Sequence, residues 1–242
     1  MFEFRFYSVA PGRLASELAL VYDMACRSDF DGRSLWDLYS VPMPVGSWTG
    51  LSGSRLPAFL YIIKWNSLTE RDACFPRFWS DPTWQKRRAE LTDGMPLVDS
   101  IENWLLDASP AWKAHMEERS DAKVGGVHEL RIQKVLNGSQ AAAAEALSDV
   151  YLPAEKSQGA RVLGVFDLVI GPDRPLMMTM LAWPDIETKH AAAYQIDRDA
   201  RVLAQRQAEK QRFGRRLFGE LDQYLLEPVE WNTPFANLGE SA

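Results

Sequence analysis

The sequence predicts an α+β fold in which two copies of a β-α-β-β-α-β unit close their sheets into one barrel within a single chain. The first observation is that "FEFRFYSVAPG" near the start returns about halfway along as "VHELRIQKVLNG". Two further blocks of similar residues then follow in the same order in each half. Because an internal repeat constrains a whole fold, we derive the architecture from these blocks.

The first block pairs a Glu-x-Arg strand with a turn. Its residues Glu3, Arg5, Val9 and Gly12 recur at one constant spacing as Glu129, Arg131, Val135 and Gly138. Pro11 and Asn137 are the matching turn-formers, and an alanine-rich apolar segment follows each turn, at 14–24 and 141–151. Each half therefore begins with a predicted strand, turn and helix.

The second and third blocks extend the match to the end of each half. In the second block, Gly46, Pro57, Trp65, Ala73 and Asp81 match Gly164, Pro175, Trp183, Ala191 and Asp199. In the third, "ENWLLD" at 102–107 matches "DQYLLE" at 222–227. The spacing between matching residues is shorter in these two blocks than in the first block, so the first copy holds extra residues, within or beside 29–44. These residues form either a lid over one barrel mouth or a surface loop that has diverged.

The elements of the first copy follow from local pattern. Residues 2–8 alternate apolar and polar side chains, as a half-buried strand does, and 14–24 have a helical mix of residues after the Pro-Gly turn. Next, "VGSWTGL" and "AFLYIIKW" read as two strands joined by the turn "SGSRLP".

A helical region and a last strand complete the copy. Ser67 and Glu70 have the spacing of a capping box, which opens a helix, and Asp81 followed by Pro82 restarts it. Residues 98–106 supply the last strand. The resulting order is that of a ferredoxin-like unit, whose antiparallel sheet carries its helices on one face and must cover the other.

Two such units cover their bare faces by closing into one α+β barrel. We place the first repeat at 1–112, a linker at 113–126, the second repeat at 127–230 and a C-terminal tail at 231–242. The linker contains the junction "KVGGV".

Composition narrows the class of protein. The chain has 242 residues, of which 46% are hydrophobic and 25% charged, with a formal net charge of −6, which disfavours nucleic acid as a partner. No apolar run is long enough to span a bilayer and no secretory signal opens the chain, so we expect a cytoplasmic protein without a membrane partner. The two cysteines and three histidines show no metal-ligand spacing, and no cofactor motif is present, so we expect neither metal nor cofactor.

The polar faces of the first strands are the main candidate site. We expect the two first strands to pair, so that Glu3, Arg5 and Tyr7 meet Glu129, Arg131 and Gln133 in the barrel interior, while Phe2, Phe4 and Phe6 pack under the helices. Arg5 and Arg131 would then anchor an anion, Glu3 or Glu129 would act as general base, Tyr7 would donate a hydrogen bond, and Gln133 would contact the ligand. The alternative is that the two acids and two arginines form a structural ion-pair network.

Aromatic residues supply a second set of candidates. Trp48, Tyr61 and Trp65 could form the wall of a pocket for a flat or apolar ligand, although aromatics on strands are also typical of a core. We expect the aromatic residues of 78–84 to be exposed, and they are candidates for a contact between copies of this chain. A homo-oligomer is therefore one possible partner.

These residues resemble the NIPSNAP family of the dimeric α+β barrel superfamily. The resemblance rests on the opening Glu-x-Arg-x-Tyr strand, the Pro-Gly turn, Gly46-x-Trp48, and "IIKWNSLTERDA" followed by "DPTW". Family members often carry a histidine two residues before the position of Trp65, where this chain has Ile63. The resemblance implies an α+β barrel and a pocket but names no reaction.

Two functional hypotheses follow. In the first, the barrel lumen binds a small organic acid or an aromatic metabolite, with cofactor-free acid/base chemistry as an extension. In the second, the barrel is filled and the protein is a non-catalytic interaction or scaffold protein, as the resemblance also implies.

Overall fold

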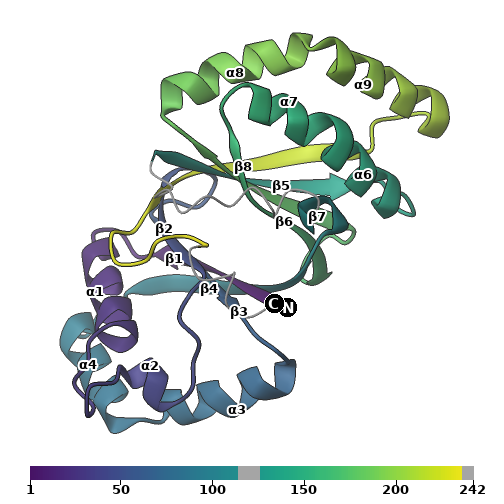
Figure 1. The fold of residues 1–242 in the computed structure, drawn as a ribbon. Coiled ribbons are helices and arrows are strands. Elements are labelled where there is room, and N and C mark those ends of the chain that lie inside the picture. The colour runs from purple at the N-terminus through teal and green to yellow at the C-terminus, as the bar shows by residue number, and fades with distance from the viewer. Residues whose placement is uncertain (114–125, 236–242) are drawn as a thin grey trace. The chain divides into compact units, whose positions relative to one another are not determined.

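A computed structural model describes residues 1–113 and 126–235 (Figure 1). Each half of the chain has the order strand, helices, two strands, helices, strand. The elements of the first half are β1 (Phe2–Val9), α1 (Leu14–Ala25), α2 (Leu35–Leu38), β2 (Gly46–Ser52), β3 (Ala58–Lys64), α3 (Leu68–Trp79), α4 (Pro82–Thr92) and β4 (Val98–Ala108).

The second half follows a short helix, α5 (Pro110–Lys113). Its elements are β5 (Val127–Val135), α6 (Gln140–Ala146), a π-helical turn (Leu147–Tyr151), α7 (Leu152–Ser157), β6 (Arg161–Ile170), β7 (Leu176–Trp183), α8 (Ile186–Arg198), α9 (Ala200–Phe213) and β8 (Phe218–Pro228). The predicted linker, 113–126, falls almost wholly outside the described residues, as does most of the predicted tail.

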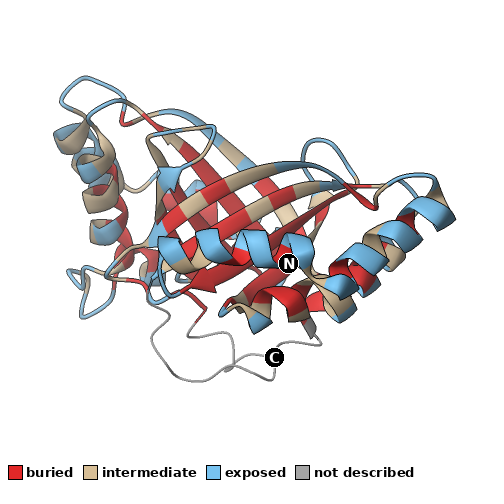
Figure 2. Ribbon diagram, turned by 90° about the horizontal axis from the view of Figure 1, so that it is seen from above, coloured by how far each residue is buried: buried red, intermediate tan, exposed pale blue. Residues whose placement is uncertain are grey.

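The strands confirm the predicted fold class. Hydrogen bonding orders them β1-β3-β2-β8-β5-β7-β6-β4 in one ring, and the pairs with a resolved register are antiparallel. The strands are largely buried, whereas the outer sides of the helices are exposed (Figure 2). An antiparallel sheet with helices on one face is the arrangement expected for ferredoxin-like units.

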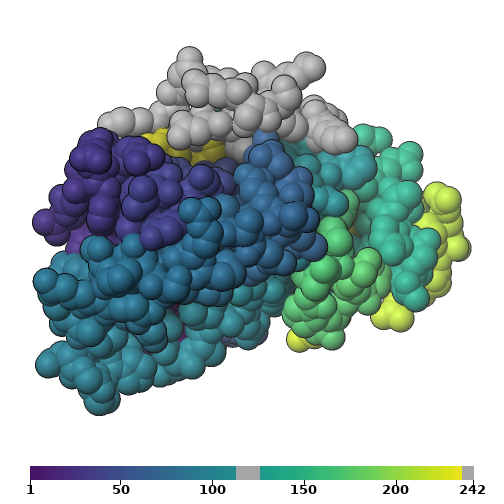
Figure 3. Space-filling view, turned by 90° about the horizontal axis from the view of Figure 1, so that it is seen from below, coloured from purple at the N-terminus to yellow at the C-terminus, as the bar shows by residue number. Residues whose placement is uncertain are grey.

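The chain divides into two compact units, which we describe separately. Unit 1 holds Met1–Gly50, Arg55–Asn103 and, at the C-terminal side, residues 228–235. Unit 2 holds Leu51–Ser54 and, among the described residues, 104–113 and 126–227. In unit 1 the helices α1, α3 and α4 form an outer layer, seen in purple and blue in Figure 3.

The pairing of the first strands differs from our prediction. β1 pairs with β3, and β5 pairs with β7 and β8, so the two first strands are not partners. The Glu-x-Arg sequence of each half faces side chains of its neighbouring strands instead. The prediction was wrong because similarity between two strands says nothing about which strand each one pairs with.

The orientation of β1 is also the reverse of our prediction. The register joins Arg5 to Tyr61 and Tyr7 to Phe59, and Tyr7, Phe59 and Tyr61 belong to the core that also contains Leu20 of α1. The Glu-Arg-Tyr face of β1 therefore lies under the helices, and Phe2, Phe4 and Phe6 lie on the other face. The alternation of apolar and polar residues along β1 shows that its two faces differ in composition. Both faces are buried, however, so the apolar residues did not indicate which face the helices cover.

The extra segment of the first copy is packed into unit 1. Ser34 caps α2 through a capping box with Asp37: each backbone N–H donates to the other residue's side chain at 3.1 Å. Leu35 and Trp36 are then buried in the helix-side core, as is Val41. These contacts disagree with the interpretation of this segment as a diverged surface loop. That the segment acts as a lid stays a prediction.

Candidate functional site

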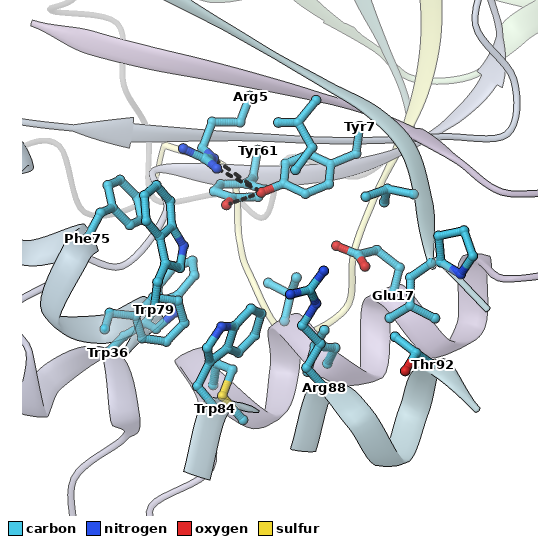
Figure 4. A pocket seen from close by; sticks show the side chains of 18 of the residues that line it. Arg5, Tyr7, Glu17, Trp36, Tyr61, Phe75, Trp79, Trp84, Arg88 and Thr92 are labelled. Carbon is cyan, nitrogen blue, oxygen red and sulfur yellow. Dashed lines mark hydrogen bonds between the residues drawn. The ribbon is translucent and has the colours of Figure 1, made fainter. Parts of the chain in front are cut away.

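Unit 1 contains a cavity of about 410 Å³ between the strands β1 and β3 and the helices that cover them (Figure 4). Its side chains come from β1, β3, all four helices of the first half and the start of β4. The cavity therefore lies on the helix side of the sheet. We predicted that the candidate residues would meet in the barrel lumen, but the cavity-lining residues meet on this other side.

Aromatic rings form most of one wall. Trp36 packs edge-on against Phe78, Phe78 lies 4.9 Å from Trp84, and Phe75 stacks on Trp79 at 5.1 Å, measured between ring centroids. All five rings line the cavity. Broad apolar walls with a few polar groups are typical of small-molecule pockets.

Glu3 is not among the lining residues, but it binds Arg5, which is, and every acceptor position of its carboxylate is occupied. Its carboxylate accepts hydrogen bonds from Trp65 Nε1 at 2.8 Å, from Arg5 Nη1 at 2.9 Å, and from Arg71 Nε and Nη2 at 3.0 Å. Glu3 is fully buried. A carboxylate held by four donors is well suited to fix two arginines, which supports the structural reading of this residue over a general base.

Arg5 extends the network into the cavity through two tyrosines. Its Nε and Nη2 donate to the hydroxyl of Tyr7 at 3.2 and 3.1 Å, and that hydroxyl lies 2.8 Å from the hydroxyl of Tyr61 (Figure 4). Since the two lone pairs of the Tyr7 oxygen receive the Arg5 N–H groups, Tyr7 donates its own proton to Tyr61. The O–H of Tyr61 is then left to donate into the cavity.

The electrostatics of this chain keep Tyr61 neutral. Burial raises the pKa of Tyr61 well above its usual value, and the Arg5 cation offsets only part of this effect. The Arg5 guanidinium lies over the Phe75 ring at 4.9 Å and over the Tyr61 ring at 5.6 Å, where the ring faces stabilise its charge. Tyr61 is therefore a hydrogen-bond donor backed by a buried cation.

Glu17 of α1 adds an acid to the same cavity. Its side chain is buried, with 4% of the residue exposed, and it lines the cavity with its carboxyl group pointing inward (Figure 4). Burial raises the pKa of Glu17 to about 7, although Arg88 and Arg5 lower it in part. Among the described residues it has no hydrogen-bond or ion-pair partner for its carboxylate.

Unit 2 repeats the ion pair but not the tyrosines. Glu129 accepts from Arg131 Nε at 2.7 Å, from Trp183 Nε1 at 2.8 Å and from Gln223. Burial acts to raise the pKa of Glu129, but Arg131 and Lys189 outweigh it and hold that pKa below its usual value. Glu129 is therefore an ionised structural partner.

Arg131 also meets a second acid, Glu155, so that its charge is neutralised on both sides. The predicted set of six polar residues is thus divided between two units. Arg5 and Tyr7 line the cavity of unit 1, whereas Glu129, Arg131 and Gln133 belong to unit 2 and do not line it.

The predicted aromatic residues also separate. Tyr61 lines the cavity. Trp65 donates to Glu3 and packs on Phe75, with 1% of the residue exposed, so it is a core residue behind the site. Trp48 lies opposite Leu60 on the other face of the sheet, so it does not reach the cavity.

Several cavity residues were missed by sequence reasoning. Glu17 carried a usable signal, because it stands at helical spacing before Leu20, Val21 and Met24 on the buried side of α1. The sequence predicted that the aromatics of 78–84 make surface contacts. In the structure Phe78 is buried, Trp84 is half-buried, and Trp79 is 43% exposed. Arg88 gave no signal beyond its place in a short basic run.

Metal-ligating side chains and long apolar helices would indicate other kinds of site. No group of three or more histidine, cysteine, aspartate or glutamate side chains could hold a metal ion within 1–113 and 126–235. In the same residues, no helix combines the length and the apolar composition that a bilayer crossing requires.

Comparison with known proteins supports the fold and part of the family resemblance. Residues 37–111 match the family model of NIPSNAP, which confirms the resemblance over that range. No curated protein matches the sequence.

Three solved structures show the same fold at low identity. An anthrone oxidase-like protein aligns with a TM-score of 0.58 and 13% identity over 95% of this chain and 91% of that one. A candidate monooxygenase from Fusobacterium nucleatum subsp. nucleatum aligns with a TM-score of 0.53 and 10% identity over 95% and 92%. A chlorite dismutase mutant from Candidatus Nitrospira defluvii aligns with a TM-score of 0.50 and 11% identity over 98% and 96%.

Proposed function

We propose that the cavity of unit 1 binds a small aromatic compound that carries an acidic or carbonyl oxygen. The observation that carries this proposal is the buried chain Arg5–Tyr7–Tyr61, which ends in a hydroxyl inside an aromatic-walled cavity. A flat ring would pack between the tryptophans, and its oxygen would accept the hydrogen bond of Tyr61.

Charge supports an anionic or electron-rich oxygen. In unit 1 two cations, Arg5 and Arg71, share the buried carboxylate of Glu3. The second acid near Arg71, Asp72, has 67% of its side chain exposed and offers little compensation in the interior. Arg88 at the cavity wall adds a further positive charge. Glu17 is the acid among the described lining residues, and burial favours its neutral form below about pH 7, so this part of unit 1 favours a ligand with negative charge there.

The alternative of an interaction or scaffold protein has weaker support. It required the aromatics of 78–84 to form a surface, but Phe78 and Trp84 pack into the cavity wall, and of these aromatics Trp79 alone is exposed. It also expected a filled barrel, which the cavity does not test because this cavity lies on the helix side of the sheet.

Calorimetric titration with two matched probes tests the proposal. 2-Naphthoate and 2-naphthol share one ring system and differ in the oxygen group that they offer to Tyr61. We expect both to bind, with 2-naphthoate tighter at pH 6, where the Glu17 carboxyl is mostly protonated. Tyr61→Phe should weaken 2-naphthoate binding about tenfold or more, because a hydrogen bond to a charged group contributes roughly 1.5–3 kcal/mol.

The matched control is Tyr194→Phe, since Tyr194 is exposed on α8 of unit 2 and lies outside the cavity. It should leave both affinities unchanged. If neither probe binds, or if Tyr61→Phe binds as tightly as the native protein, the proposed function is wrong and the interaction hypothesis becomes the better one.

A further inference from the structure

The unpartnered carboxyl group of Glu17 is the feature that ligand binding alone does not explain. The other buried acids of the described chain have strong donors: Glu129 has Arg131, Glu155 has the same arginine, and Glu209 accepts from Tyr151 at 2.6 Å and from Arg216 at 3.2 Å. A buried carboxyl without donors destabilises a fold. Packing therefore does not explain why a glutamate stands at position 17.

The second half of the chain shows that the fold does not require an acid at this place. The N–H of Glu17 bonds to Arg13 one turn back on α1, and the N–H of Ala143 bonds to Ser139 in the same way on α6. At this corresponding position, Ala143 is fully buried. An alanine thus satisfies the packing of the helix on the sheet.

The tyrosines differ between the halves in the same manner. Gln133 stands where Tyr7 stands on β1, and Thr179 pairs with Arg131 as Tyr61 pairs with Arg5. The Glu-Arg pair and its tryptophan are common to both units, whereas Glu17, Tyr7 and Tyr61 are found together in unit 1. All three of these residues line the cavity, beside Arg5.

The groups around Glu17 suit a carboxyl that gains and loses a proton. From the elements packed against it, Arg5 of β1 and Arg88 of α4 carry charge, and Tyr7 and Tyr61 present hydroxyls to the same cavity. Burial moves the pKa of Glu17 up to about 7, against the opposing pull of Arg88 and Arg5. A general base is most effective when its pKa lies near the working pH.

We propose that Glu17 is the acid/base residue of the cavity and moves a proton on an enolisable aromatic carbonyl compound whose oxygen is held by Tyr61. This inference rests on the proposed function, because it needs the compound to bind with its oxygen at Tyr61. It extends that function from binding to catalysis.

The step requires no oxidant or cofactor. The Glu17 carboxylate removes a proton from the carbon beside the carbonyl group, and the electrons of the broken C–H bond form the C=C bond of an enolate. The negative charge that develops on oxygen is stabilised by the Tyr61 O–H and, behind it, by Arg5 through Tyr7. Glu17, now a carboxylic acid, returns the proton to the same or to a conjugated carbon, which regenerates the site.

Deuterium exchange of 2-tetralone in heavy water tests this step. This probe has an aromatic ring and an enolisable ketone, and 2-naphthol is the flat analogue of its enol. We expect the native protein to accelerate loss of the proton signals beside the carbonyl group, followed by NMR, with a rate that rises with pH through about 7 as Glu17 ionises. Glu17→Gln should lower the rate about 100-fold or more.

Two controls separate catalysis from binding and folding. Glu17→Gln should still bind 2-naphthol with nearly native affinity, because the Tyr61 chain is intact, and Glu145→Gln, an exposed acid on α6, should keep the full exchange rate. Glu17→Asp, which retains the carboxyl group on a shorter stem, should give an intermediate rate.

The outcomes distinguish this inference from the proposed function. If 2-naphthol binds but exchange is not accelerated, or if Glu17→Gln exchanges at the native rate, Glu17 is not the acid/base residue while the binding function stands. If neither 2-naphthol nor 2-naphthoate binds, both proposals fall together.

Discussion

Arg5 and Arg131 show how two similar residues acquire different roles from their partners. Arg131 lies between Glu129 and Glu155, so both sides of its guanidinium are neutralised by acids. Arg5 shares Glu3 with Arg71 and directs its remaining donors to the hydroxyl of Tyr7. The same residue type therefore closes a structural network in unit 2 and supports a polar cavity in unit 1.

Glu17 should make the stability of the protein depend on pH. Its pKa rises from 4.5 to about 7 on folding, so the folded state binds the proton more tightly. The contribution of Glu17 to the free energy of unfolding is therefore most favourable below pH 4.5, and this contribution is lost as the pH rises through about 7. The loss approaches about 3 kcal/mol at most, from 1.36 kcal/mol per pKa unit.

Glu17→Gln removes this dependence. Urea unfolding of both proteins between pH 5 and 8 should show that the variant gains stability relative to the native protein as the pH rises, with the difference levelling off above about pH 7. A difference that stays constant across this range would show that Glu17 titrates normally in the folded state.

At the scale of elements, α1 and α2 determine the shape of the cavity. α1 brings Glu17 inward on the same side as Leu20 and Met24, and α2 brings in Trp36. α2 is one turn long, and a helix this short depends on its caps. Its capping box at Ser34 and Asp37 therefore holds part of the aromatic wall in place.

Ser34→Ala should weaken that wall. The change removes the side-chain acceptor for the backbone N–H of Asp37, which costs about 1 kcal/mol for a typical N-cap. We expect a lower free energy of unfolding by about that amount and a modest loss of 2-naphthol affinity by calorimetry.

The control for this variant is Ser100→Ala, at an exposed position of β4. It should change neither property. Unchanged stability in Ser34→Ala would mean that the packing of Leu35 and Trp36 alone holds α2.

At the scale of the whole molecule, the two units offer an internal test of the ion pairs. Glu129→Gln should lower the free energy of unfolding by about 3 kcal/mol, because it takes a buried charge partner from Arg131 and Lys189. We expect 2-naphthoate binding to be unaffected, since Glu129 lies in unit 2 and the cavity in unit 1.

Both readouts of Glu129→Gln are informative. Native stability would contradict a structural role for the second ion pair. A loss of 2-naphthoate binding in a folded variant would mean that unit 2 contributes to the site, as the original hypothesis of a shared lumen required.

The sequence by itself determined the element order and the fold class, because hydrophobic alternation, turn residues and caps act locally and recur in both halves. It also offered Arg5, Tyr7 and Tyr61 as candidates, since polar and aromatic residues on a strand stand out from their neighbours, and these three residues line the cavity of unit 1. The tertiary structure decided strand pairing and which face of β1 the helices cover, because both depend on contacts between residues far apart in the chain. For the same reason it drew attention to Glu17, because only the folded chain shows a buried carboxyl in the cavity without a hydrogen-bond or ion-pair partner among the described residues.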